Sequence, residues 1–480
     1  MSRPQRGGAE CCFESAQPGR NRPHVDGGVS IVSSLNPGLR SYIACHDAFL
    51  DGSDTPRAFL DRCLSVIDTR EDDVQAFVCA DFDAARHAAD ASTARWQSGS
   101  QISAIDGMPV GVKDIMETAD LPTEQGSPLF KGWRGGRDCA AVAALREAGA
   151  IIVGKTVTTE FAASYPGKTR NPWDLARTPG GSSSGAAAAV GCGMLPGSTA
   201  SQVIGSTIRP ASFCGAYGYK PSVGGINRGG SFDGFSQSCT GMIAASLAEC
   251  WSMTREITSR TGGDPGYVGV TGPMTMPAPR MPRKLALLRT AGWANASPAA
   301  QGELRRARDA AAAAGVEVLD HERAPQLARF EAAIENAMAL SNRINTWEGR
   351  WPLDTYARDM DAAALSQYAR ERLADAQSMS QEIYQGLLTE RAAIRDLYAA
   401  LHEKFDACMT LAAPGAAPQG LAWTGDPAFT VATSLIGMPA VTLPVLKDQG
   451  LPLGLQVIGF VDQDATLFAH ANALQSIFNP

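Results

Sequence analysis

The chain has 480 residues, of which 44% are hydrophobic and 19% are charged, values typical of a globular protein with a sizeable core. Its 42 lysines and arginines and 49 aspartates and glutamates give a net charge of −7 without any basic block, so nucleic acid and anionic membranes are poor candidate partners. No run approaches the roughly 20 apolar residues of a membrane helix, and the N-terminus has no apolar signal core, so we expect a cytoplasmic protein with no membrane partner.

The cysteines and histidines show no spacing typical of a metal site. The 11 cysteines are scattered, with only Cys11 and Cys12 adjacent, and the 6 histidines form no H-x-x-x-H or H-E-x-x-H pair. We therefore expect free thiols in a reducing compartment, no metal centre and no cofactor.

The chain begins with a segment that has no helical or strand period. Residues 1–32 are rich in Gly, Pro, Arg and Ser, which predicts a disordered leader. Residues 39–50 and 56–70 then have the period of amphipathic helices. Strand-like apolar segments recur between helical ones after that, at residues 74–81, 107–112, 150–155, 285–288, 316–320, 408–412, 438–445 and 453–460. This alternation predicts a layered α/β protein with a mostly parallel or mixed sheet.

Residues 296–405 differ from the rest because their pattern is almost wholly helical. They also carry several aromatic residues, Trp347, Trp351, Tyr356, Tyr368 and Tyr384. No Pro/Ser-rich linker divides the chain after the leader, so we expect one large domain over residues 33–480, with a variable helical cap at 296–405.

The stretch Gly149–Thr156 reads GAIIVGKT and satisfies the phosphate-loop pattern G-x-x-x-x-G-K-[ST]. A phosphate loop follows a strand and opens a helix, because its backbone N–H groups must surround a phosphate. Here a helix-period segment precedes Gly149, and the run AIIV resembles a buried strand that leads up to Gly154. The pattern therefore favours a helix followed by a strand, with Lys155 ion-paired or at the strand's end, and nucleotide binding stays an alternative.

Residues 177–226 form a low-charge segment that is dense in Gly and Ser yet apolar enough to be buried. Within it, GSSSG at Gly181–Gly185 matches the G-x-S-x-G elbow of α/β hydrolases, which would make Ser183 the nucleophile. That elbow needs a strand directly before it, and the prolines at 172 and 179 argue against one. This second alternative is therefore disfavoured.

Four separated segments carry a resemblance to a known family. They are GMPVGVKDIMETADLPTEQGS, TPGGSSSGAAAAV, GSTIRPASFCGAYGYKPS and GMPAVTLPVLKDQGLPLGLQVIG, at residues 107–127, 178–190, 205–222 and 437–459. In this order they are similar to the motifs of the amidase signature family. The similarity extends from about residue 35 to 475 and is weakest between 270 and 405. It implies a single α/β/α domain with a mixed, twisted sheet of about eleven strands.

The resemblance also implies three catalytic residues. Ser206 would be the nucleophile, Ser182 a relay on a cis peptide bond, and Lys113 the base. A serine hydroxyl is a weak nucleophile until a group takes its proton, and a lysine can do so only when it is neutral. Lys113 follows the apolar segment GMPVGV, where burial would disfavour the ammonium form and lower the pKa.

The backbone N–H groups of the turn Val203, Ile204, Gly205 and Ser206 are expected to form the oxyanion hole. The family has a Gly or Ala where this chain has Ile204, which would be costly if the position needed a positive φ. Arg209, Ser183 and Gln202 are further candidates for substrate binding. An arginine three residues after the nucleophile could hold a substrate carboxylate or brace the loop through an ion pair.

These observations predict a hydrolase that cleaves the C–N bond of amides, with carbamates and anilides as further candidate substrates, through an acyl-enzyme. A small-molecule substrate and a monomer or homodimer are expected. A glutaminase-type subunit of a tRNA amidotransferase is the alternative from the same family, and it would need an ammonia tunnel and stable partner subunits.

Overall fold

One mixed β-sheet of 11 strands runs through residues 38–478, the part of the chain that the structure, a computed structural model, describes. The predicted leader at residues 1–32 lies outside the described residues. The strands are β1 (Phe77–Ala80), β2 (Pro109–Lys113), β3 (Ile151–Thr156), β4 (Gly197–Gln202), β5 (Tyr217–Lys220), β6 (Cys239–Ala244), β7 (Lys284–Leu287), β8 (Glu317–Leu319), β9 (Ala407–Leu411), β10 (Ala440–Asp448) and β11 (Leu451–Ile458).

The strands lie in the order β1-β3-β2-β4-β6-β5-β10-β11-β9-β7-β8. β2 pairs in parallel with β3 and β4, β7 pairs in parallel with β8 and β9, and the other neighbours are antiparallel. The predicted α/β class with a mixed sheet of about eleven strands is therefore confirmed. The sequence pattern did not identify β4, β5 and β6 as strands, because they lie in segments dominated by small and polar residues.

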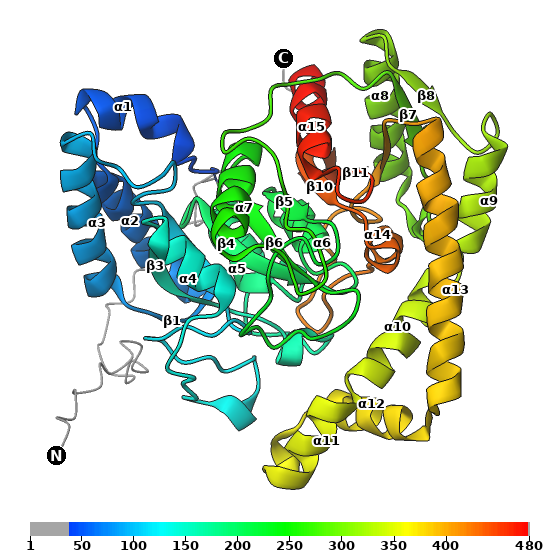
Figure 1. Cartoon of the computed structure of the whole chain (residues 1–480), viewed down its shortest axis with the longest axis horizontal. Coiled ribbons are helices and arrows are strands. Elements are labelled where there is room, and N and C mark those ends of the chain that lie inside the picture. Colours follow the sequence, from blue (N-terminus) through cyan, green and yellow to red (C-terminus); the bar gives the residue numbers. More distant parts are fainter. Residues whose placement is uncertain (1–37, 479–480) are drawn as a thin grey trace, which may run out of the picture.

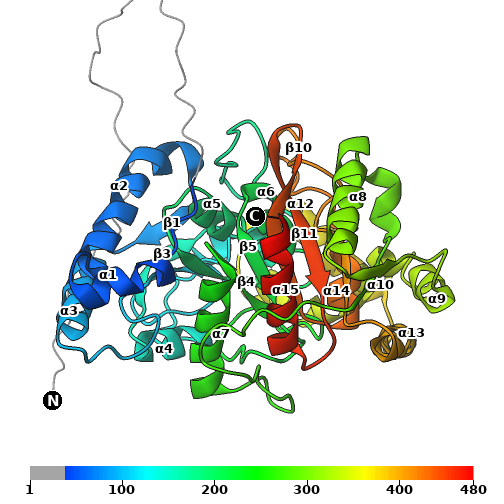
Figure 2. The ribbon, with the colours of Figure 1, turned by 90° about the horizontal axis from the view of Figure 1, so that it is seen from above.

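The described part of the chain contains fifteen α-helices. They are α1 (His46–Asp51), α2 (Pro56–Val74), α3 (Phe82–Gln97), α4 (Ala140–Glu147), α5 (Ser184–Gly191), α6 (Ile208–Cys214), α7 (Leu247–Thr261), α8 (Pro298–Ala313), α9 (Pro325–Ala333), α10 (Ala337–Glu348), α11 (Arg350–Asp359), α12 (Gln367–Ser378), α13 (Gln381–Ala399), α14 (Val431–Ile436) and α15 (Asp464–Phe478). Figure 2 shows α5 and α6 on one side of the central strands and α7 and α15 on the other.

Most of the region from 296 to 405 projects from the sheet. α8 packs against β10 and α15, and β8 is an edge strand, so both belong to the layers around the sheet. The helices α10–α13, here called the helical arm, extend beyond it, with α11 and α12 at the far end (Figure 1). Serine N-caps begin the last two arm helices, because Ser366 accepts from the Ala369 N–H and Ser380 from the Ile383 N–H. α10 and α13 pack on each other and on α14.

Helix α5 positions the Gly/Ser-rich segment against the sheet. All its residues, SGAAAAVG, are buried, and it contacts β2, β3, β4 and β6. A Cβ at Gly185 would lie 2.1 Å from the Ala76 carbonyl oxygen and 2.3 Å from the Val157 nitrogen, so only glycine fits there. The small side chains thus let the start of α5, and the serines before it, approach the ends of the central strands.

Candidate active site

Lys113 ends β2, an internal strand that lies third from the β1 edge of the sheet and whose residues are all buried. Its side chain is fully buried, and its Nζ donates hydrogen bonds of 2.7 Å to Ser182 Oγ and to Ser201 Oγ. Its backbone N–H donates to Thr199 Oγ1 at 3.1 Å. Within residues 38–478, no carboxylate forms an ion pair with Lys113. The amine is therefore surrounded by hydroxyl groups and not by a compensating charge.

This environment favours the neutral amine. Burial lowers the pKa of Lys113 from 10.5 to about 7, and the negative charge of Asp233 opposes that shift. A lysine with a pKa near 7 is partly neutral at neutral pH, so it can accept a proton from a neighbouring hydroxyl.

Ser182 lies in the loop directly before α5, and the peptide bond between Gly181 and Ser182 is cis. The side chain is 1% exposed, and its Oγ accepts from Lys113. The backbone of the next residue reaches the other candidate serine, since the Ser183 N–H donates to the Ser206 carbonyl oxygen at 3.3 Å. The loop before α5 thus links the positions of Lys113 and Ser206.

Ser206 lies between β4 and α6 and borders an open pocket of about 320 Å³. The residue is 9% exposed, and no hydrogen bond of its Oγ is recorded within residues 38–478. Its hydroxyl is therefore available to a molecule in the pocket, whereas Ser182 is held by the lysine behind it.

The turn at residues 203–206 presents unoccupied N–H groups beside Ser206. In the described part of the chain, no hydrogen bond from the four backbone N–H groups of this turn to another protein group is found. The carbonyl oxygens of the turn, by contrast, accept hydrogen bonds from other residues. The side chain of Gln202 fixes the following turn, since its Oε1 accepts from the N–H groups of Thr207 and Ile208 at 3.0 Å. The free N–H groups of the turn at residues 203–206 are suited to hold an oxyanion without rearrangement.

Two residues shape this turn. Gly205 is required by contact, because a Cβ there would lie 2.2 Å from Thr430 Oγ1. Ile204 does not have a positive φ, so its branched side chain causes no backbone strain there. The side chain is half-buried, borders the pocket and packs against the apolar cluster that includes Ile208 and Leu435. It therefore adds apolar bulk next to the candidate nucleophile.

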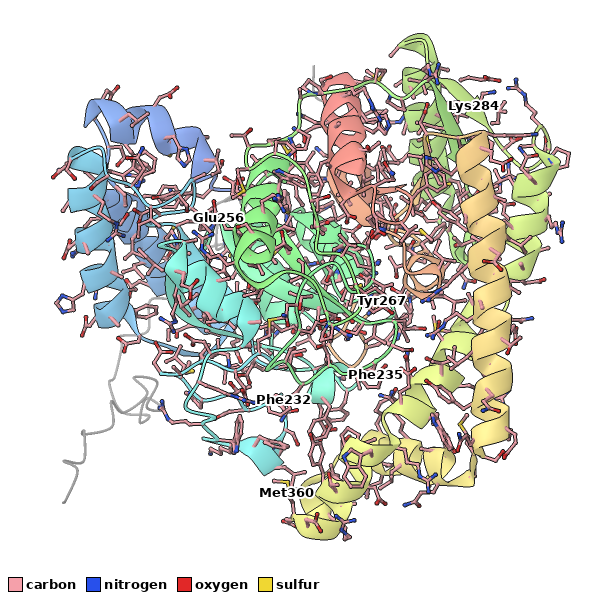
Figure 3. All side chains as sticks on the ribbon, viewed as in Figure 1. Phe232, Phe235, Glu256, Tyr267, Lys284 and Met360 are labelled. Atoms are coloured by element: carbon pink, nitrogen blue, oxygen red, sulfur yellow. The ribbon has the colours of Figure 1, made fainter. Side chains whose placement is uncertain are left out.

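The pocket lies between the body of the protein and the helical arm. One wall is made by residues 161–164, 203–206, 423–425 and 427, and the other by polar side chains of α10 and α12. Phe235 also borders it, and Figure 3 shows Phe232 and Phe235 on the side of the body that faces α11 and α12. The helical arm thus supplies one side of the pocket.

Arg209 borders the pocket from the first turn of α6 and is 5% exposed. Its Nη2 donates to the Gly181 carbonyl oxygen at 2.8 Å and to Thr424 Oγ1 at 3.1 Å. No carboxylate pairs with it in residues 38–478, and its Nε has no partner. Burial lowers its pKa to about 10. Arg209 braces the loop before Ser182 and retains unused hydrogen-bond donors.

Two other candidates for substrate binding do not reach the pocket. Ser183 is fully buried and donates to the Ser201 carbonyl oxygen at 3.3 Å, and Gln202 is fully buried with its amide nitrogen bound to Ser434 Oγ at 3.0 Å. Both side chains therefore support the backbone around the site, and their assignment to substrate binding is corrected. The elbow alternative at Ser183 also fails, because no strand lies directly before Gly181: the preceding strand, β3, already ends at Thr156.

The stretch GAIIVGKT forms no phosphate loop. Gly149 follows α4, and Ile151–Thr156 is the strand β3, with Lys155 fully buried. Lys155 Nζ lies 3.2 Å from Asp114 Oδ1 and donates to Met116 O at 2.8 Å and to Thr123 Oγ1 at 2.6 Å. The strand continues through Gly154, its predicted end, and ends two residues later at Thr156. The ion pair with Asp114 explains how the charged Lys155 can be buried. The nucleotide-binding alternative is therefore wrong.

Three residues near the site were not identified from the sequence. Ser201 could have been found from the two-residue period of β4, which places it on the same face as Thr199, beside Lys113. The charge of Asp233 raises the pKa of Lys113, and Asn345 borders the pocket from α10. No local sequence pattern identifies either residue.

The described residues contain neither a metal-binding cluster nor a membrane-spanning helix. Between residues 38 and 478, no group of three or more His, Cys, Asp or Glu side chains is placed to hold a metal ion. In the same part of the chain, every helix is too short or too polar to cross a membrane.

Comparison with known proteins adds a family match and several relatives. A model of the amidase family matches residues 57–468. A glutamyl-tRNA(Gln) amidotransferase subunit of Salinispora arenicola (strain CNS-205) is 29% identical, covering 89% of this chain and 94% of that protein. The same subunit of Anaeromyxobacter dehalogenans (strain 2CP-C) is 30% identical, covering 87% of this chain and 92% of that protein.

Solved structures share the fold at lower identity. The crystal structure of an amidase has a TM-score of 0.79 at 24% identity, covering 92% of this chain and 100% of that chain. A bacterial aryl acylamidase of the amidase signature enzymes has a TM-score of 0.78 at 19% identity, covering 92% of this chain and 96% of that chain. The likeness extends over nearly the whole described chain.

Proposed function

The chain belongs to the amidase signature family, and from this premise we propose that it is a serine hydrolase that cleaves the C–N bond of amides. The observation that carries the proposal is the 2.7 Å hydrogen bond between Lys113 and Ser182, in a buried site where the pKa of the lysine is about 7. Ser206 borders the pocket beside them.

In the proposed reaction, Ser206 attacks the amide carbonyl carbon. Its proton passes to Ser182, whose own proton passes to the neutral amine of Lys113. A neutral amine has two N–H donors and one lone pair, so Lys113 can donate to Ser201 while it accepts from Ser182. The negative charge on the carbonyl oxygen is held by the N–H groups of the turn at 203–206.

The second half of the reaction returns the proton. Lys113 and Ser182 deliver it to the leaving nitrogen, which departs as an amine or ammonia and leaves an acyl ester on Ser206. Water then attacks the ester while the same groups take its proton; they return this proton to the Ser206 oxygen as the ester bond breaks and the carboxylic acid leaves. Separating one difficult step into two easier ones is the benefit of the covalent intermediate.

The proposed substrates are small linear amides, with carbamates and anilides as further candidates. The pocket of about 320 Å³ is large enough for a small molecule, and Ile204 makes its wall near Ser206 apolar. Arg209 is the proposed contact for an anionic group, since this arginine borders the same pocket and no carboxylate pairs with it among residues 38–478.

A second candidate is a glutaminase subunit of a tRNA amidotransferase, favoured by the names of the curated relatives at 29% and 30% identity. Such a subunit would release ammonia from glutamine and pass it to a partner. The purified chain would then hydrolyse glutamine preferentially and need its partner subunits for full activity.

A single screen tests the proposal. The purified chain is assayed on aliphatic amides, aryl amides, carbamates, esters, dicarboxylic monoamides and glutamine, and labelled with a fluorophosphonate. Ser206→Ala and Ser182→Ala should lose several orders of magnitude in kcat, because such groups act as a unit, and Ser206→Ala should lose the label. Ser183→Ala is the matched control and should stay active. A labelled, active Ser206→Ala protein would overturn the assignment.

A further inference from the structure

One side chain in the pocket wall has no partner within the protein. Asn345 on α10 borders the pocket and is only 3% exposed. Neither its Oδ1 nor its Nδ2 forms a hydrogen bond. Among residues 38–478, it is the only side-chain amide that buries both polar atoms without a partner.

The packing of α10 fixes the position of Asn345 in the pocket wall. Leu340 and Ile344 of α10 are buried in the apolar cluster beneath the helix, which fixes the orientation of its other face. Arg372 of α12 donates to the Asn345 carbonyl oxygen at 2.7 Å, and its guanidinium lies 5.4 Å from the centre of the Phe235 ring. The backbone of Asn345 is therefore held between the helical arm and the body.

A buried amide with both ends unpaired makes the free protein less stable than a leucine of similar shape would. A ligand that supplies the missing donor and acceptor would recover this cost. Asn342 and Thr346 border the pocket one turn before and one residue after Asn345, and neither has a recorded side-chain hydrogen bond within residues 38–478. This face of α10 is thus polar, uncharged and able to both donate and accept.

We propose that Asn345 is a specificity-determining residue that binds a second carboxamide or ureido group of the substrate, remote from the bond that is cleaved. The substrate class is then a diamide or a ureido amide, an assignment that rests on the proposed amidase function. Only a group with both a donor and an acceptor satisfies both ends of Asn345. A carboxylate leaves Oδ1 unpaired, an ammonium leaves Nδ2 unpaired, and an alkyl group leaves both unpaired.

The test uses primary amides H₂N–CO–(CH₂)n–X of increasing length, where X is a carboxamide, a carboxylate, a methyl ketone or an isopropyl group. For the symmetric diamides, kcat/KM is halved because either end can react. The wild-type protein should prefer carboxamide over isopropyl by about 10²-fold or more, since unpaired polar groups in a built site discriminate strongly. Asn345→Leu should reduce this ratio to near one and raise the melting temperature.

Asn336→Leu is the matched control, since Asn336 is exposed, directly precedes α10 and does not border the pocket. It should keep the wild-type ratio. Binding gives an independent measurement, because a diamide should raise the melting temperature of Ser206→Ala but not of Ser206→Ala/Asn345→Leu. If Asn345→Leu does not fold, Asn345→Ala replaces it in both measurements.

The inference is overturned if the wild-type protein hydrolyses these amides without preferring the carboxamide. It is also overturned if Asn345→Leu keeps the preference, or if it lowers the melting temperature and all rates equally, as a structural role would. If no amide is hydrolysed and no label reaches Ser206, the proposed function itself fails, which is a different result.

Discussion

Replacing Asp233 by Asn should shift the pH dependence of amide hydrolysis to lower pH. Asp233 is 1% exposed, and its carboxylate accepts from Ser231 Oγ at 2.9 Å and from Ser238 Oγ at 2.7 Å. Its charge raises the pKa of Lys113, while burial lowers it to about 7. An asparagine has nearly the same shape, and its amide can bond both hydroxyls after they rotate, so the charge is the main change.

The size of the effect follows from the neutral fraction of Lys113. The base works only when neutral, so activity is present above its pKa and is lost as the pH falls through it. With a pKa of about 7, the neutral fraction is about one tenth at pH 6 and about nine tenths at pH 8, so kcat/KM should rise about tenfold between them. A downward shift of one pH unit in the variant would raise kcat/KM at pH 6 about fivefold.

The assay is kcat/KM between pH 5 and 9 with an amide whose acylation is rate-limiting, so that the profile reports the free enzyme. Asp264→Asn is the matched control. Asp264 is also buried and pairs with Arg228 at 2.6 Å, the arginine whose Nη1 donates to the Asp233 carbonyl oxygen, but it does not affect the pKa of Lys113. A flat profile, a limb displaced upward in Asp233→Asn, or an equal shift in Asp264→Asn would refute the reasoning.

Three further outcomes are expected near the site. Ile204→Ala should change kcat/KM unequally across acyl groups of different size and cost less stability than the roughly 2–5 kcal/mol of a fully buried Ile→Ala change; a uniform loss would mean that the side chain only supports the turn. Lys155→Met should destabilise the protein by about 3–5 kcal/mol in denaturant titrations, because it leaves Asp114 unpaired. In a separate measurement, neither ATP nor GTP with Mg²⁺ should raise the melting temperature of the wild-type protein. Gly205→Ala should reduce kcat through the clash with Thr430 Oγ1, and adding Thr430→Ala should restore part of it; a double variant no better than the single one would contradict this.

The strands that the sequence predicted are those built from large apolar residues. β3, β10 and β11 contain runs such as IIV and LQVI, which only a buried element accommodates. β4 reads GSTASQ and has no such run, although all its residues are buried. Its small side chains are explained by the close approach of α5, a tertiary contact that no local pattern reveals.

The candidate site divides in the same way. Lys113 and its burial could be predicted because they lie in a local apolar strand, and Ser182 and Ser206 because their motifs resemble a family. The polar residues around these three could not be predicted from the sequence. Asn345 lies far after Ser206 in the sequence and meets the pocket only through the packing of the helical arm. The place of such residues in the pocket is therefore revealed only by the structure.

Two buried lysines on neighbouring strands show why burial alone does not define a base. β2 and β3 are parallel, and Lys155 is paired in register with Val112, one position before Lys113. Alternate residues point to opposite faces of a sheet, so the two amines lie on different sides. Lys155 meets the carboxylate of Asp114, and a buried charge with a counter-charge stays an ion pair. Lys113 meets only hydroxyls, so the neutral form is favoured and the amine becomes a base. The chemistry of each lysine is thus decided by the partner on its face of the sheet, which explains how GAIIVGKT can contain a fully buried lysine that has a structural role while Lys113 has the catalytic one that we propose.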